Sequence, residues 1–252
     1  MKRSIFCIAL ALALAWAPTA SAGLFEDFFQ ASPPDYLAAA EPSQVPPRIQ
    51  TSSNWASMQT DLRSMEENGY VNIGQSVWRG RYEDPKKAIK KAKKIKAEVV
   101  LFSYQYISSE AGGSMYMPHP GSMPGGLAVP ITFHTYDVAA VYLTKIRPEK
   151  IGFGISTRFM TPEEVQAIGT NKAGVVEFVI RGSAAFDADL IKGDVILTIA
   201  GQDFSNKEKM AQLRTDSAGQ TVPLELVRNG KRMTLPITVP KAPMVTLIEK
   251  TK

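Results

Sequence analysis

The stretch that decides the fold of this chain is GVVEFVIRGSAAFDADLIKGDVILTIAGQ, residues 174–202. Two runs rich in β-branched and apolar residues, 175–181 and 195–200, predict strands. Glycines bound both runs, as expected of short strands joined by tight turns. Outward from this stretch, further strands are predicted at 151–159, 222–228 and 233–239. Asn229-Gly230 predicts the hairpin turn between the last two.

Two helices accompany these strands in the prediction. Thr161-Pro162-Glu163-Glu164 has the composition of a helix start, with a threonine cap, a proline in the first turn and a glutamate three residues after the threonine. The second helix is predicted at 207–215. Residues 147–240 are therefore expected to form a β-barrel-like domain with two helices, and residues 241–252 a tail.

The order of short motifs in this region resembles the bacterial form of the PDZ domain found behind the protease domain of envelope high-temperature-requirement serine proteases. The motifs are Gly174-Val175-Val176, Gly182-Ser183-Ala184-Ala185, Ala188-Asp189-Leu190, Lys192-Gly193-Asp194-Val195-Ile196 and Ile199-Ala200-Gly201-Gln202. Two positions depart from the family pattern: Ala184 replaces a usual proline and Asp189 replaces a usual glycine. Both departures fall in scaffold turns, so the expected binding groove is unaffected.

The resemblance implies a groove that captures the C-terminal end of another polypeptide by strand addition. Glycines at 152 and 154 allow the backbone to turn so that several N–H groups converge on a carboxylate. The strand that follows is expected to pair with the ligand, and one helix face to shape a pocket for an apolar last side chain. The peptide-binding residues predicted in this way are Gly152, Phe153, Gly154, Ile155, Ser156, Thr157, Phe159, Met210 and Leu213. The alternative is that the glycines form only a tight turn, and that Met210 and Leu213 belong to the core.

Residues 54–146 predict a small α/β sandwich with the order α-β-α-β-β, which makes the whole chain α+β. The apolar spacing of Trp55, Met58, Leu62 and Met65 predicts a helix that ends at Asn68-Gly69. A strand at 70–77, a helix at 85–96 and a strand at 98–107 predict a right-handed βαβ unit, followed by an antiparallel strand at 136–146. Residues 108–135 are rich in Gly, Pro, Ser and Met and are expected to form a long loop. The segments 69–74, 84–86 and 92–101 resemble a domain of uncharacterised exported bacterial PDZ proteins, which implies no activity.

The N-terminal segment predicts export. Lys2 and Arg3 precede an apolar run from Ile5 to Ala17, and small residues ending at Ala22 suit a signal peptidase, so residues 1–22 are predicted as a signal peptide. Its removal lowers the formal net charge from +5 to +3 and takes away Cys7, the one cysteine of the chain. Proline-rich residues 23–53 are predicted as a tether. The apolar cluster Leu24–Phe29 either packs back on a domain or meets a partner or membrane.

No residue pattern supports catalysis or a cofactor. The chain has two histidines and no recognisable nucleophile–base pair, and 54–146 is too short for a double-barrel protease. Met115, Met117, His119 and Met123 offer soft ligands for copper(I), but their irregular spacing favours a loop without metal. The lysine-rich segment 86–96 predicts a solvated helix face, with contact to an anionic membrane as the alternative.

The resulting prediction is a non-enzymatic exported protein, periplasmic or secreted, that binds the C-terminal peptide of another envelope or secreted protein. Its mild charge gives no reason to expect nucleic acid as a partner. Two alternatives come from other classes of function. One is a regulatory or degenerate relative of an envelope serine-protease system that acts in trans. The other is a metal-handling protein that uses the Met/His loop.

Overall fold

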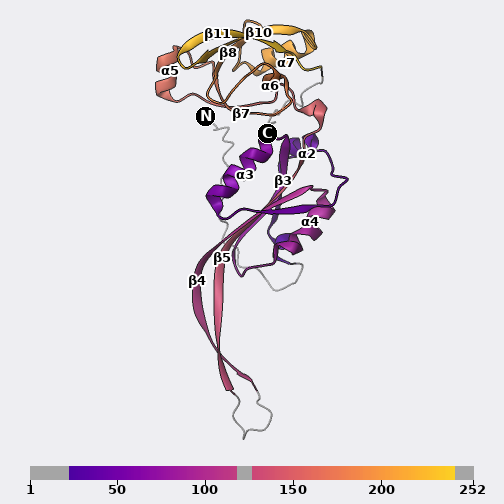
Figure 1. The fold of residues 1–252 in the computed structure, drawn as a ribbon, viewed down its shortest axis with the longest axis vertical. Helices are drawn as coiled ribbons and strands as arrows, with labels where there is room; N and C mark the ends of the chain where they lie inside the picture. Colours follow the sequence, from indigo (N-terminus) through magenta and orange to yellow (C-terminus); the bar gives the residue numbers. More distant parts are fainter. Residues whose placement is uncertain (1–22, 118–126, 242–252) are drawn as a thin grey trace, which may run out of the picture.

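The computed structural model describes residues 23–117 and 127–241 of the chain. They form an α/β domain, a long β-hairpin projecting from it, and a β-rich domain at the opposite end (Figure 1). Among these residues no helix is both long and apolar enough to cross a membrane. The α+β class is confirmed, whereas the predicted signal peptide and the tail from residue 242 lie outside the described ranges.

The α/β domain is built on a five-stranded sheet in the order β1-β3-β5-β4-β2. Its elements are α1 (Leu24–Asp27), β1 (Phe29–Ala31), α2 (Pro34–Ala39), β2 (Arg48–Thr51), α3 (Trp55–Glu67), β3 (Tyr70–Gly80), η1 (Pro85–Lys87), α4 (Ala88–Ile95), β4 (Val99–Met117) and β5 (Leu127–Lys145). β5 runs antiparallel to both β3 and β4, so it separates the two parallel strands of the predicted βαβ unit. The predicted order α-β-α-β-β is present as α3-β3-α4-β4-β5.

The central strand β5 is buried on both faces, and each face has its own helix. Ala139, Val141 and Leu143 pack against Met58 and Leu62 of α3 in one apolar cluster. The alternate residues of β5 join Ala88 and Ala92 of α4 in a second cluster; they are Val138, Ala140 and Tyr142. The sandwich thus has three layers, with the sheet between α3 and α4, because alternate side chains of β5 point to opposite faces and fill two separate cores.

The helix α3 begins and ends where the sequence predicts. The Asn54 side chain accepts a hydrogen bond from the Ser57 N–H at 2.9 Å, and the Ser57 hydroxyl accepts one from the Asn54 N–H, which makes a capping box. At the other end Gly69 adopts a φ of +75°. Glycine takes this left-handed conformation without steric cost, so it ends the helix.

The segment predicted as a tether, 23–53, is instead part of the α/β domain. β1 pairs with β3 and β2 pairs with β4. The Phe25 side chain is 2% exposed and meets the Trp78 ring edge-on at 5.0 Å between centroids. The tether prediction is wrong because the apolar residues around Phe25 gain from burial, while the prolines of the segment lie outside β1 and β2 and remove no sheet hydrogen bond. The apolar cluster Leu24–Phe29 therefore packs back on a domain, which was one of the two alternatives for it.

The predicted long loop at 108–135 is also largely wrong. β4 continues to Met117 and β5 resumes at Leu127, so the two strands form a hairpin whose tip, 118–126, lies outside the described residues. Gly112 and Gly113 are absorbed by a register shift between Ala111 and Ser114, where Gly113 has a φ of +93°. A β-bulge of this kind accepts an extra residue without ending the ladder.

The lysine-rich helix departs from the predicted solvated face at one position. Lys91 is 8% exposed, and its ammonium lies 3.0 Å from a Glu26 carboxylate oxygen and 3.6 Å from the centroid of the Phe29 ring. The Glu26 pKa is lowered, first by its hydrogen bond with Lys91. The helix α4 therefore holds the N-terminal segment in place through Lys91. The lysine-rich composition of α4 does not reveal that one of its lysines has a partner in that segment.

The C-terminal domain has a sheet in the order β11-β10-β8-β7-β6, with β9 paired to β8. The sheet is open, because the described strands β6 and β11 at its two ends do not pair with each other. Its elements are η2 (Pro148–Lys150), β6 (Ile155–Arg158), α5 (Pro162–Ile168), β7 (Gly174–Val179), α6 (Ala184–Asp187), β8 (Val195–Ile199), β9 (Gln202–Asp203), α7 (Lys207–Asp216), β10 (Thr221–Arg228) and β11 (Lys231–Thr238). The two predicted helices are α5 and α7, and α6 adds a single turn between them.

Contacts at one end of α3 connect the two domains. The Arg181 N–H donates to the Glu67 carbonyl at 2.8 Å. The Arg63 guanidinium lies over the Phe178 ring at 5.1 Å from its centroid. Phe178 belongs to β7, so this junction fixes the strand beside which β6 lies.

Candidate functional site

The turn that precedes β6 depends on two glycines in left-handed conformations. Gly152 has a φ of +61° and Gly154 a φ of +74°. A Cβ atom on Gly154 would lie 2.1 Å from the Cβ of Ser183, which leaves no room for a side chain. The sequence predicted that glycines shape this turn. At position 154 a glycine is required by both backbone conformation and packing.

The backbone groups of this turn are largely engaged in hydrogen bonds of their own. The carbonyl of Phe153 accepts a hydrogen bond from the Ala185 N–H at 3.0 Å, and that of Gly154 accepts one from the Ile180 N–H at 2.8 Å. The Phe153 N–H has no acceptor among the described residues. The Gly154 N–H donates to the Ile151 carbonyl at 3.1 Å, so of these two residues only Phe153 keeps an N–H that can donate to a negatively charged ligand, where the sequence predicted several such groups.

The free edge of β6 follows from its ladder with β7. Ile155 lies opposite Val179, and the bond from the Ile180 N–H to the Gly154 carbonyl flanks this pair. In an antiparallel ladder, that pattern marks Ile155 and Val179 as a non-hydrogen-bonded pair. The N–H and C=O of Ile155 therefore point away from β7.

Thr157 has the same orientation. Its partner Val176 uses its own N–H and C=O for bonds to Asp194 and Gly193, on the β8 side, at 2.8 and 2.9 Å. Val176 therefore offers no backbone group to β6, and the N–H and C=O of Thr157 point to the open edge. Two residues at i and i+2 thus present the donors and acceptors that an added strand needs.

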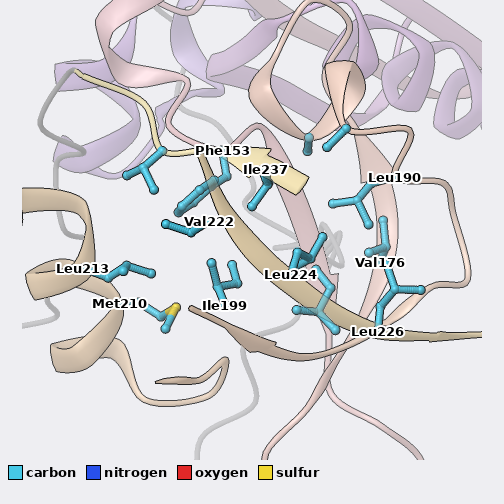
Figure 2. Packing of buried hydrophobic residues seen from close by; sticks show 14 residues of the cluster. Phe153, Val176, Leu190, Ile199, Met210, Leu213, Val222, Leu224, Leu226 and Ile237 are labelled. Carbon is cyan, nitrogen blue, oxygen red and sulfur yellow. The ribbon is translucent and has the colours of Figure 1, made fainter. Parts of the chain in front are cut away.

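The apolar side chains predicted for the pocket come together in the domain core. Met210 and Leu213 of α7 are 7% and 8% exposed and belong to one cluster with Phe153, against which Ile155 packs (Figure 2). Met210 and Leu213 are therefore core residues, as the alternative reading expected. Their role in a pocket for the last side chain of a ligand stays a prediction.

The remaining predicted residues, Ser156 and Phe159, lie away from the core cluster that contains Met210 and Leu213. Ser156 is 8% exposed, and its hydroxyl has no hydrogen-bond partner among the described residues. It shares a sheet position with Phe178, the residue under Arg63 at the domain junction. Phe159 is 69% exposed and lies just after β6, which ends one residue earlier than predicted. Ser156 thus faces the junction, away from the side of Ile155.

An ion pair that sequence analysis missed holds the far end of β6. The Arg158 guanidinium makes two hydrogen bonds with the Glu164 carboxylate, at 2.6 and 2.7 Å. The Glu164 pKa falls to about 2, first because of Arg158 and then because its carboxylate accepts the Thr161 N–H. Glu164 was predicted only as part of a helix cap. The sequence signal for this ion pair was the presence of opposite charges at Arg158 and Glu164, six residues apart across the strand–helix boundary.

The candidate metal ligands are not brought together by any described contact. Met115 lies on the hairpin and is 53% exposed. The side chain of Met117 and the whole of His119 and Met123 fall outside the described residues. Copper binding by this segment stays a prediction.

Comparisons with known proteins bear on the C-terminal domain. Residues 153–239 match the family model described as PDZ domain. Similar solved structures include "HtrA-type protease AlgW with decapeptide" (22% identity, TM-score 0.30, covering 50% of this chain and 41% of that one). They also include the PDZ domain of HtrA3 bound to a phage-derived ligand (20% identity, TM-score 0.29, covering 34% of this chain and 81% of that one).

The chain spans less than half the length of the first protease structures it resembles. No curated protein matches it. The family model extends from the glycine turn before β6 to the end of β11. The predicted PDZ domain is confirmed, and residues 153–239 are a PDZ domain.

Proposed function

We propose that the PDZ domain captures the apolar C-terminal end of another protein by adding that peptide to β6 as a further strand. The observation that carries this proposal is the open edge of β6, where Ile155 and Thr157 direct their backbone groups away from β7. An extended peptide satisfies such an edge with its own main chain, whatever its sequence. Strand addition therefore requires no further change in the fold.

The end of the added peptide is recognised by the glycine turn. The Phe153 N–H, which has no acceptor among the described residues, lies directly before the strand that binds the ligand backbone. A terminal carboxylate that accepts this N–H forms a charge-assisted hydrogen bond. The last side chain then meets the apolar surroundings of Ile155, to which Met210 and Leu213 belong. An apolar final residue is the expected preference.

The proposal includes an exported, non-enzymatic protein with a partner in the bacterial envelope. Export rests on the sequence of residues 1–22, which has the pattern of a signal peptide. A binding role without catalysis rests on the lack of a recognisable nucleophile–base pair in the sequence. The peptide partner is then a periplasmic or secreted protein whose C-terminus is accessible.

Two substitutions at Thr157 test strand addition directly. Thr157→Pro removes an N–H that β7 does not use, and proline is tolerated on an edge strand, so the fold is retained. Thr157→Val keeps the N–H and the β-branched shape, which makes it the matched control. The probe is a library of peptides that end in Val, Leu, Ile or Phe, and affinity is measured by fluorescence anisotropy.

The proposal expects Thr157→Val to bind the selected peptides like the unmodified protein and Thr157→Pro to lose at least about tenfold in affinity, since hydrogen bonds and the edge itself are lost. Amidation of the peptide C-terminus removes the charged acceptor and is expected to cost about ten- to a hundredfold. Equal binding of amidated and free peptides, or no effect of Thr157→Pro, would refute strand addition with carboxylate capture.

A further inference from the structure

The hairpin formed by β4 and β5 projects far beyond the rest of the α/β domain (Figure 1). β2 ends its pairing with β4 at Phe102, and β3 ends its pairing with β5 at Tyr136, so beyond these points the two strands pair with each other alone. We call this part the arm. Its β4 portion from Tyr104 to Met117 is about 45 Å long at about 3.3 Å per residue. An isolated two-stranded ribbon is only marginally stable in water, so a partner surface would stabilise it.

One face of the arm is aromatic. It is defined by Tyr82, Tyr104, Tyr106, His134 and Tyr136. Tyr82 lies 5.1 Å from Tyr104 and 5.8 Å from Tyr136 between ring centroids. Tyr106 lies 5.7 Å from Tyr136 and 6.1 Å from His134. These contacts make a continuous row of rings, which we call the aromatic face.

The aromatic face is exposed although it continues the domain core. Tyr104 contacts the fully buried Phe102 at 5.9 Å between centroids. In contrast, Tyr82, Tyr104 and Tyr106 are 42%, 43% and 51% exposed. Rings stacked on a core yet half open to water are typical of a surface that a partner covers.

Charge distinguishes the two faces of the arm. None of the residues of the aromatic face is Asp, Glu, Lys or Arg, and the sequence has none of these from Ala111 to Tyr136. The opposite face carries Glu110, across from Phe133, and the ion pair of Arg79 with Asp137 lies at the base of that face, with 2.6 Å between the nearest atoms. The partner of the aromatic face is therefore expected to be neutral as well, because burying an unpaired charge against it would be unfavourable.

The edges of the arm are less suited to association than its face. Pro130 of β5 has no N–H to donate, and β4 has register shifts after Tyr106 and after Ala111. Prolines and bulges of this kind protect edge strands against pairing with further strands. Phe133, on the opposite face, is 62% exposed, but it lies across from Glu110 and over Gly112. The aromatic face is therefore the larger uncharged apolar surface of the arm.

We propose that two copies of this chain associate through the aromatic faces of their arms, packed against each other about a two-fold axis. A two-fold interface brings the same surface of both copies together. Contacts between the lysine-rich α4 helices of two copies would be repulsive. The aromatic face is neutral, so it meets itself without this repulsion.

The available area suits a weak dimer. An aromatic side chain buries about 150–250 Å² in total, so each half-exposed tyrosine of the face has on the order of 100 Å² left to bury. With three such tyrosines and their neighbours in each copy, the pair buries on the order of 1,000 Å², near the lower limit of specific interfaces. We therefore expect a reversible dimer with a dissociation constant on the order of micromolar.

The test is sedimentation velocity of the purified protein over about 1–100 μM, a range that brackets such a constant. The unmodified protein is expected to shift from monomer to dimer as its concentration rises. Tyr106→Asp places like charges on two facing surfaces and is expected to weaken the dimer at least about tenfold. Gln105→Lys is the matched control for Tyr106→Lys, since it adds the same charge to the next residue, on the opposite face and across from Asp137.

A mixing experiment guards against a damaged arm in the variant. Tyr106→Asp and Tyr106→Lys are each expected to be monomeric, and an equimolar mixture is expected to form a mixed dimer because opposite charges then face each other. A protein that is monomeric at all concentrations, equal effects of Tyr106→Lys and Gln105→Lys, or a mixture that stays monomeric would overturn the proposal. Peptide capture at β6 lies in the other domain and is independent of these outcomes.

Discussion

Glu66 at the domain junction should make the stability of this protein depend on pH. The carboxyl group is partly buried near the end of α3 and lies close enough to Glu177 of the PDZ domain to feel its charge. The Glu66 pKa is raised from its ordinary value of 4.5 to about 7, first by burial and then by the charge of Glu177, against the lowering effect of Arg63. The Arg63 guanidinium is 3.7 Å from the carboxylate, too far for a strong ion pair.

The sign of the effect follows from proton binding. Between about pH 4.5 and 7 the folded protein holds a proton on Glu66 that the unfolded chain has released, so stability falls as pH rises through this window. The full rise in pKa corresponds to about 3 kcal/mol at about 1.4 kcal/mol per pKa unit. Since the side chain is still 21% exposed, solvent screening reduces the expected loss to about 1–2 kcal/mol.

Glu66→Gln removes the ionisation and tests this reasoning. The variant should be about 1–2 kcal/mol more stable than the unmodified protein at about pH 8, and the two should differ by only a few tenths of a kcal/mol at about pH 5. Urea unfolding followed by circular dichroism at both pH values gives the two differences. Glu67→Gln makes the same change of charge one residue along α3 and serves as the control. A gain for Glu66→Gln that is the same at both pH values would contradict the assignment of a raised pKa.

Two further substitutions test the scaffold of the PDZ domain. Gly154→Ala is expected to destabilise the folded protein by at least about 2 kcal/mol, because it adds a clash with Ser183 to the strain of a left-handed backbone. Gly182 also has a left-handed φ of +72° but open space around it, so Gly182→Ala should cost only about 1 kcal/mol. Thermal unfolding compares the two variants, and equal shifts of the melting temperature would count against the clash. Asp194→Asn should cost about 3 kcal/mol, because Asp194 is 1% exposed and its two carboxylate oxygens pair with Arg228 at 2.8 and 2.7 Å. Urea unfolding measures this loss, and a change below about 1 kcal/mol would show that the pair is dispensable.

Local sequence signals were sufficient for most of the PDZ domain. The capping box of Thr161 with Glu164 and the left-handed Asn229-Gly230 turn are present as predicted. Asp189, which departs from the family glycine, still adopts a φ of +57°. Aspartate tolerates the left-handed region better than most residues, so the turn survives the substitution. Short elements whose ends are set by neighbouring residues are the ones that sequence predicts well.

The errors fall where pairing is decided by distant residues. Residues 23–53 are proline-rich, yet β1 finds its partner in β3 and β2 finds its partner in β4. Similarly, the glycines within 108–135 indicated a loop, but Ser109 pairs with His134 and Met115 with Val129 across the hairpin. A window of local sequence contains only one side of such a pair. The pairing energy that overrides proline and glycine is therefore invisible to it.

The residues of the candidate site were predictable from sequence, but the directions of their backbone N–H and C=O groups were not. The glycine turn and the strand after it were identified from sequence, and Met210 and Leu213 do lie in one cluster with Phe153. Which backbone groups face the open edge could not be predicted. That depends on the register of β6 with β7, including the shift between Ser156 and Thr157. A one-residue slip would turn the binding groups of Thr157 toward β7.

The arm and β6 both have edges without a neighbouring strand among the described residues, and the chain treats them differently. The arm is long, and its edges carry Pro130 and register shifts that oppose strand pairing. β6 is only four residues long. Its ladder with β7 shifts between Ser156 and Thr157, but the extra residue, Glu177, lies in β7, so the open edge of β6 stays regular. An edge this short offers too few hydrogen bonds to hold another folded sheet, but enough to position a peptide whose carboxylate is also bound. The same rule that protects the arm from aggregation therefore leaves β6 open, which is the physical reason to assign strand addition to β6 and association by a face to the arm.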